Sequence, residues 1–264
     1  MSRRSAAAGA GPRGGRAGSV MFPLVGVLLL VTAWWAVKVA NGWSAFILPS
    51  PAEVVLAVAQ HWNDLVRHSA VTVWETTAGY LLAVVVAVPI GVALAYSSVF
   101  DRMFSPTLFG FNAVPKVAVA PLLVIWLGFG QLPKITMVVL LAFFPIALST
   151  AAGLKSTPAE LRELVRSLGA TPIQAFFKVR LPSALPHLFV GLKVAISLAI
   201  IGAVIGEFVG ATEGLGYVIV ASGGSADTTL AFAALVLLAG MSIGLYYLLS
   251  VVERLAVPWA EEPH

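Results

Sequence analysis

The chain has 264 residues, of which 59% are hydrophobic and 11% are charged, and its mean hydropathy is +0.95. This balance excludes a soluble globular domain and indicates an integral membrane protein. The net charge of +4 comes from basic residues in short loops beside apolar segments, which indicates membrane topology and argues against a nucleic-acid interface. Because no cysteine is present, disulfides, thiolate metal sites and cysteine nucleophiles are excluded.

Six apolar segments are each long enough to cross a hydrocarbon core of about 30 Å as a helix. The Gly-, Ala- and Arg-rich segment 1–18 before the first of them is predicted to be disordered. The first apolar run is too long for a signal peptide and lacks a cleavage site. We therefore expect an all-α, polytopic membrane protein with six transmembrane helices, at residues 22–40, 70–97, 104–127, 135–154, 186–208 and 230–252.

The distribution of Lys and Arg over the loops predicts the orientation of the chain. With the N-terminus in the cytoplasm, only Arg67 and Lys134 lie in outer loops. Both termini, including the tail 253–264, are therefore predicted to be cytoplasmic. The cytoplasmic side then holds eleven basic residues: Arg3, Arg4, Arg13, Arg16, Arg102, Lys155, Arg162, Arg166, Lys178, Arg180 and Arg254.

A short helix is expected on the outer surface after the first span. Residues 50–53 (SPAE) combine a cap residue, a proline at the first helical position and a glutamate that can bond back to the cap. We expect an amphipathic helix from this point to about Arg67. Together with the first span, it forms a predicted N-terminal region, residues 19–65.

Small residues and prolines predict how the spans pack and bend. Small residues recur at every fourth position in the second and fifth spans, which predicts close approach of neighbouring helices. Prolines within the second, third and fourth spans are expected to kink these helices. The small residues are Gly79, Ala83, Ala87, Gly91, Gly191, Ala195, Ala199 and Ala203, and the prolines are Pro89, Pro115, Pro121 and Pro145.

The loop between the fourth and fifth spans repeats the capping signature twice, at residues 157–160 (TPAE) and 171–174 (TPIQ). Gly169 stands between them, where a helix that ends near Leu168 needs a residue in the left-handed conformation. We therefore expect two short helices joined by a glycine turn. The proline-containing segment 181–186 is expected to end the second helix and to start the fifth span.

Two interpretations of this loop, residues 155–186, follow from the residues alone. It could lie on the membrane surface, with Phe176 and Phe177 in lipid and with Lys178 and Arg180 at the headgroups. Alternatively, it docks another protein, because a mere connection does not need helices with such defined ends.

Three ionisable residues within the spans are candidates for a transport pathway: Glu75, Lys116 and Glu207. A charge at the bilayer centre costs about 2.5–3.5 kcal/mol, so each should face the bundle interior, a cavity or an interface. Lys116 follows Pro115 and suits an anionic or polar heterocyclic substrate, but it could also snorkel to the headgroups. Glu75 and Glu207 are expected near the outer ends of their spans, within reach of water, and a packing role for Glu207 is equally compatible.

The sequence contains no phosphate-binding loop, because the segment 153–156 (GLKS) lacks the Gly-Lys pair and the preceding glycine. It has no nucleophile elbow either, so we expect no enzyme active site and no cofactor, and ATP chemistry must belong to a partner. His61, Asp64 and His68 could bind a metal, but a solvated helix face explains them and no further strong ligand follows.

The loop also resembles a known motif. Glu163, Gly169 and Val179-x-Leu181-Pro182 resemble the cytoplasmic signature of ABC-transporter permeases, which is Glu-Ala-Ala, then Gly, then Ile-x-Leu-Pro in the binding-protein-dependent importers. The two alanines and the isoleucine are replaced here by other apolar residues. The segments NAVPKVAVAPLLVIWLGFGQLPK and VIGEFVGATEGLGYVI resemble the nitrate, sulfonate, taurine and pyrimidine-precursor branch of this family, and the resemblance covers about residues 66–250.

The resemblance implies a type I importer permease in the inner membrane, with its core at residues 66–252, that carries a small polar or anionic solute. It implies cytoplasmic ATPase subunits, a second permease copy and an external binding protein as partners, besides lipid. An ion-coupled secondary transporter is the alternative, but it usually shows internal repeats with paired broken helices, which this sequence lacks. The residues implied to couple to the ATPase are Glu163, Gly169, Ala170, Phe176, Leu181 and Pro182.

Overall fold

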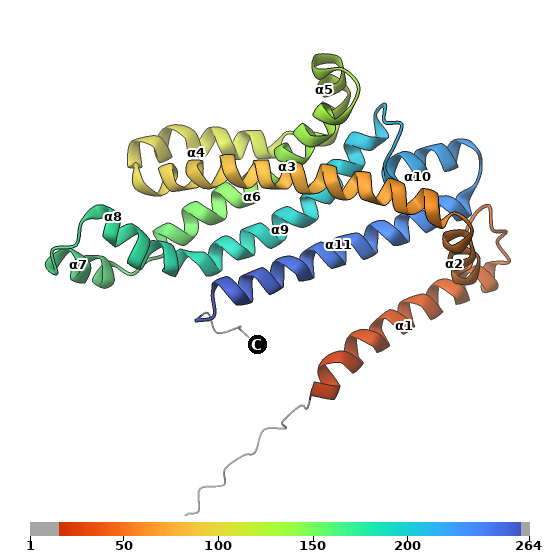
Figure 1. Cartoon of the computed structure of the whole chain (residues 1–264), viewed down its shortest axis with the longest axis horizontal. Coiled ribbons are helices and arrows are strands. Elements are labelled where there is room, and N and C mark those ends of the chain that lie inside the picture. The colour runs from red at the N-terminus through yellow and green to blue at the C-terminus, as the bar shows by residue number, and fades with distance from the viewer. Residues whose placement is uncertain (1–15, 260–264) are drawn as a thin grey trace, which may run out of the picture.

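The structure, a computed structural model, describes residues 16–259 (Figure 1). Residues 1–15 of the segment 1–18, which was expected to be disordered, lie outside this range. For residues 16–18 the expectation is wrong, because helix α1 begins at Arg16. Within residues 16–259 all regular secondary structure is helical, with no strand. The helices are α1 (Arg16–Asn41), α2 (Pro51–Gln60), α3 (Trp62–Tyr96), α4 (Ser98–Ala113), η1 (Lys116–Val119), α5 (Ala120–Leu127), α6 (Gln131–Lys155), α7 (Ala159–Ser167), α8 (Pro172–Ala175), η2 (Phe176–Arg180), α9 (Leu181–Phe208), α10 (Leu215–Gly224) and α11 (Thr228–Ala256).

Four helical segments of the described chain are long and apolar enough to cross a membrane: α3, α6, the run Pro172–Phe208 and α11. Helix α1 adds the apolar segment Val25–Asn41. The third expected span, residues 104–127, is not one helix. Helix α4 and the pair η1–α5 meet at an angle of 82°, because Val114 is extended before Pro115 and the helix cannot continue through it.

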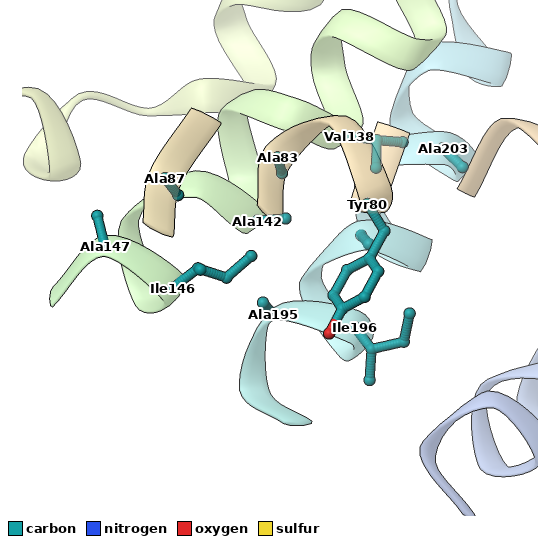
Figure 2. Packing of buried hydrophobic residues seen from close by; sticks show 11 residues of the cluster. Tyr80, Ala83, Ala87, Val138, Ala142, Ile146, Ala147, Ala195, Ile196 and Ala203 are labelled. Atoms are coloured by element: carbon teal, nitrogen blue, oxygen red, sulfur yellow. The ribbon is translucent and has the colours of Figure 1, made fainter. Parts of the chain in front are cut away.

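Helices α3, α6 and α9 form the centre of the bundle, and the expected close packing of small residues is confirmed there. Figure 2 shows alanines of all three helices at the contact, among them Ala83, Ala142 and Ala195. A Cβ atom added at Gly79 would lie 2.5 Å from Cβ of Val138, so the helices could not approach this closely with a larger residue.

Helices α2 and α10 close one end of the bundle (Figure 1). The capping box of α2 is present, since Ser50 N donates to Glu53 Oε2 at 2.6 Å and Glu53 N donates to Ser50 Oγ at 3.2 Å. The helix ends at Gln60 and not near Arg67, because a turn at His61 starts α3. The Lys38 ammonium bonds to the Glu53 carboxylate and, with Ser50, lowers the pKa of Glu53 to about 2, which ties α1 to α2.

Candidate coupling loop and pathway residues

The first helix of the loop, α7, ends as the sequence predicts but starts differently. Gly169 has a φ of +71°, and Ala170 N donates to Val165 O at 3.2 Å across the turn. The capping box expected at residues 157–160 is wrong. Pro158 occupies the cap position of α7, and the Thr157 hydroxyl instead donates to Leu154 O at 3.4 Å, at the end of α6.

The second arm of the loop is continuous with the fifth span. Its capping box is confirmed, since Thr171 N donates to Gln174 Oε1 at 2.9 Å and Gln174 N donates to Thr171 Oγ1 at 3.3 Å. The stop expected at residues 181–186 is wrong, because α8 passes through the π-helical turn η2 into α9 without a break. Pro182 lies in the first turn of α9, where the wider turn of η2 tolerates its missing N–H.

Arg180 joins this arm to the ends of two other helices. Its Nη2 donates to Leu154 O of α6 at 3.3 Å, and its guanidinium carbon lies 4.1 Å from the ring centroid of Tyr96 at the end of α3. The ring of Phe176 meets the edge of the same tyrosine at 5.9 Å. Tyr96 was not predicted as a functional residue from the sequence, although an aromatic residue at the end of a span is a typical interfacial anchor.

The residues predicted to couple to an ATPase occupy both arms of the loop. Glu163 is exposed on α7, and no ion pair involves it within residues 16–259. Gly169 is exposed in the turn, where a Cβ would meet nothing within 4 Å. The partly buried ones are Ala170, Phe176, Leu181 and Pro182.

Lys116 lies at the bend between α4 and η1. Its ammonium donates to Asn112 O at 3.0 Å and to Asn112 Oδ1 at 2.9 Å, and it lies 4.8 Å from the ring centroid of Phe144. The side chain is partly buried, so this cation is held across the bend and against α6.

Glu75 forms an ion pair with Lys134. Lys134 was expected in an outer loop, but it lies in the first turn of α6, is 6% exposed, and its Nζ is 2.5 Å from Glu75 Oε1. The expected access of water to Glu75 and Glu207 is also wrong, because both side chains are buried. The need of a buried carboxylate for a cation was the one signal that could have identified Lys134.

Glu207 holds the start of the short helix α10. Its Oε1 accepts from the Thr72 hydroxyl at 2.6 Å and its Oε2 accepts from Gly216 N at 2.5 Å. A Cβ at Gly214 would lie 2.2 Å from the Glu207 carboxyl carbon, so only a glycine lets the chain fold over this group. We call Thr72, Glu75, Lys134 and Glu207 the buried polar cluster.

His61, Asp64 and His68 lie near the start of α3. Within residues 16–259 no group of three His, Asp or Glu side chains is arranged to hold a metal ion. His68 instead accepts a hydrogen bond from Gly214 N, at 3.0 Å from Nδ1. His68 therefore helps to hold the loop before α10.

The chain is similar to known proteins along most of its length. Residues 87–261 match the family described as binding-protein-dependent transport system inner membrane component. A probable ABC transporter permease protein of Haemophilus influenzae is 38% identical over 224 residues, which cover 85% of this chain and 91% of the relative. The riboflavin transport system permease protein of Chloroflexus aurantiacus is 38% identical over 240 residues, which cover 89% and 88%. The taurine transport system permease protein of Escherichia coli is 31% identical over 241 residues, with coverages of 89% and 88%.

A solved structure has the same fold. A chain of the inward-facing MetNI methionine ABC transporter matches with a TM-score of 0.63 and 27% identity, over 75% of this chain and 97% of that chain. The match is to the transmembrane part of an ABC importer, so the fold is that of a type I importer permease and the alternative of a secondary transporter is excluded. In this family ATP hydrolysis belongs to a separate subunit. The chain thus belongs to the inner membrane components of binding-protein-dependent transport systems, the permease subunits of ABC importers.

Proposed function

We propose that this permease carries a small polar or anionic solute and that the loop 155–186 transmits motion of the ATPase subunits to the pathway. One observation carries the proposal: the continuous run Pro172–Phe208 contacts helices α3 and α6 near both of its ends. At the loop end these contacts join Tyr96, Leu154 and Arg180. At the opposite end the contacts are those of the buried polar cluster.

The shape of the loop supports its role as a lever. A capped arm that runs into the span without a flexible joint moves the span when the arm is pushed. The glycine turn and the contacts of Arg180 fix the angle between the two arms and the bundle. We propose that the exposed Glu163 and the turn at Gly169 contact the ATPase, whereas Ala170, Phe176, Leu181 and Pro182 hold the arms in place.

Lys116 is the residue we propose for contact with the solute. Its position at an 82° bend places a cation where the backbone is interrupted, as in transport pathways. Other relatives are named as permeases for aliphatic sulfonates, which are anions, and for formylaminopyrimidine. We assign Glu75 and Glu207 to the far end of the pathway, where they hold the helices that must separate.

We further propose that two copies of the chain form the pathway in the inner membrane, with both termini in the cytoplasm and without nucleic acid as a partner. The distribution of basic residues supports this orientation. The exposed apolar side chains on α5 and just after it support a partner copy or lipid at that face, among them Ile125, Trp126 and Phe129. The proposed division of the chain is an N-terminal region (19–65), a permease core (66–252) and a cytoplasmic tail (253–264).

The proposal is tested by uptake into sealed vesicles that contain the permease, its ATPase and its binding protein. We expect uptake of a sulfonate or a related small anion only with ATP and with both partners present. Uptake that persists without ATP and follows an ion gradient would contradict the proposal.

A further inference from the structure

A cationic hollow lies between the loop and the end of α3. Its volume is about 160 Å³, and arginines from both arms of the loop line it: Arg162, Arg166 and Arg180. The phenol of Tyr96 adds a polar group at its edge, and the other lining residues, Pro172 among them, are apolar. Within the described chain no carboxylate lines this hollow, so its charge is not balanced from inside the protein.

The arginines have unused bonding capacity. Neither Arg162 nor Arg166 takes part in an ion pair within residues 16–259. Arg180 uses Nη2 for Leu154 O, but its Nε is buried without a hydrogen-bond partner. Guanidinium groups that line one space and keep N–H groups without acceptors fit a group with several anionic oxygens, such as a phosphate.

A second hollow adjoins the first and is apolar. The two share Tyr96 and Pro172, and the second is lined further by Val92, Ile173, Phe176 and Phe177. Its volume is about 270 Å³. A ligand that fills both hollows therefore needs an anionic head and a hydrocarbon tail.

The position of the hollows along the bundle favours a lipid. Helix α9 has 28 residues, which corresponds to a rise of about 42 Å. A bilayer is about 40–45 Å thick with its headgroups. Because Arg180 directly precedes α9, we place it at headgroup level, with Val92 one turn nearer to the hydrocarbon than Tyr96. The phosphate of a membrane lipid can therefore contact the arginines while it stays in the headgroup layer of the bilayer.

We propose that this pair of hollows binds an anionic phospholipid, with its phosphate at Arg162, Arg166 and Arg180 and an acyl chain against Val92 and Phe176. The site is separate from the solute pathway and does not depend on the substrate or on the ATPase. Because it lies between the loop and the bundle, a bound lipid would stiffen the contact between the two arms and α3.

Native mass spectrometry of the full-length permease in detergent tests the proposal, with phosphatidylglycerol and phosphatidylcholine as probes. We expect retention of one phosphatidylglycerol per chain in preference to phosphatidylcholine, and no displacement by inorganic phosphate. Displacement by inorganic phosphate would overturn the assignment to a lipid, and equal retention of both lipids would overturn the role of the arginines.

Variants with a matched control locate the site. Arg166→Gln should weaken phosphatidylglycerol binding about fivefold, and Arg180→Gln should do the same. Lys178→Gln removes the same charge from an exposed position of the same loop that lies outside these hollows, and it should leave binding unchanged. Equal loss in Lys178→Gln and Arg166→Gln would contradict a defined site. Loss of the lipid on addition of the ATPase would assign the hollow to an acidic segment of that protein instead.

Discussion

Gly214 shows how a single residue without a side chain shapes the far end of the bundle. Its φ is +114°, and a Cβ would strike the carboxyl group of Glu207. We predict that Gly214→Ala lowers the unfolding free energy by about 1–3 kcal/mol, measured as a lower melting temperature in detergent.

The matched control is Gly223→Ala, in the same segment of the chain. A Cβ at Gly223 meets nothing within 4 Å, so this variant should melt like the parent protein. If both alanine variants melted alike, the close contact between Gly214 and Glu207 would not be a constraint on the fold.

At the scale of single residues, the prediction about transport concerns Lys116. An anion bound by its ammonium loses a charged hydrogen bond in Lys116→Met, so uptake should fall about tenfold or more, while the amount of assembled permease changes little. Lys116→Arg keeps the charge and should retain more uptake. Unchanged uptake by Lys116→Met would contradict a contact between Lys116 and the solute. The residue would then act only through its hydrogen bonds to Asn112 across the bend.

At the scale of helices, the Glu75–Lys134 pair joins α3 to α6 inside the bundle. Lys134→Met leaves a buried carboxylate without its cation and should cost about 3–5 kcal/mol of stability. The double variant Glu75→Gln, Lys134→Met removes both charges and should recover most of this loss. Chemical denaturation of these two variants and of Glu75→Gln alone measures the coupling, and strictly additive costs would contradict a direct ion pair.

Local signals in the sequence predicted several helix ends correctly. The boxes at Ser50 and Thr171 and the turn at Gly169 depend only on residues within one turn, and the structure contains all three. The signature at Thr157 failed because Pro158 takes the cap position and the hydroxyl finds an acceptor in the preceding helix.

The features that depend on tertiary contacts could not be read from the sequence. Pro115 predicted a kink, but not that the span breaks by 82°. Helix α10 has ten residues, is too short for a span, and is defined by its contacts with Glu207 and Thr72. Lys134 is separated from Glu75 by 59 positions, so the pair has no local signal.

On the scale of the whole molecule, the same three helices meet at two distant places. The contact of Arg180 lies within the loop 155–186, and the contact at Glu207 lies at the other end of α9. Alanines and glycines pack closely along α3, α6 and α9 (Figure 2). This packing restricts movement of one helix relative to another between the two contacts. A push on the loop is therefore expected to move the far ends of these helices, which is what an ATP-driven permease requires.

The central claim is that the shape of the loop couples the ATPase to transport, and Gly169→Val tests it most directly. Gly169 has a φ of +71° and open space around it, so valine acts through the backbone alone, whereas Gly169→Asn tolerates this conformation. In vesicles that contain the ATPase and the binding protein, we predict that Gly169→Val inserts normally but loses uptake per ATP hydrolysed, and that Gly169→Asn retains it. Normal ATPase binding together with normal uptake in Gly169→Val would contradict the account.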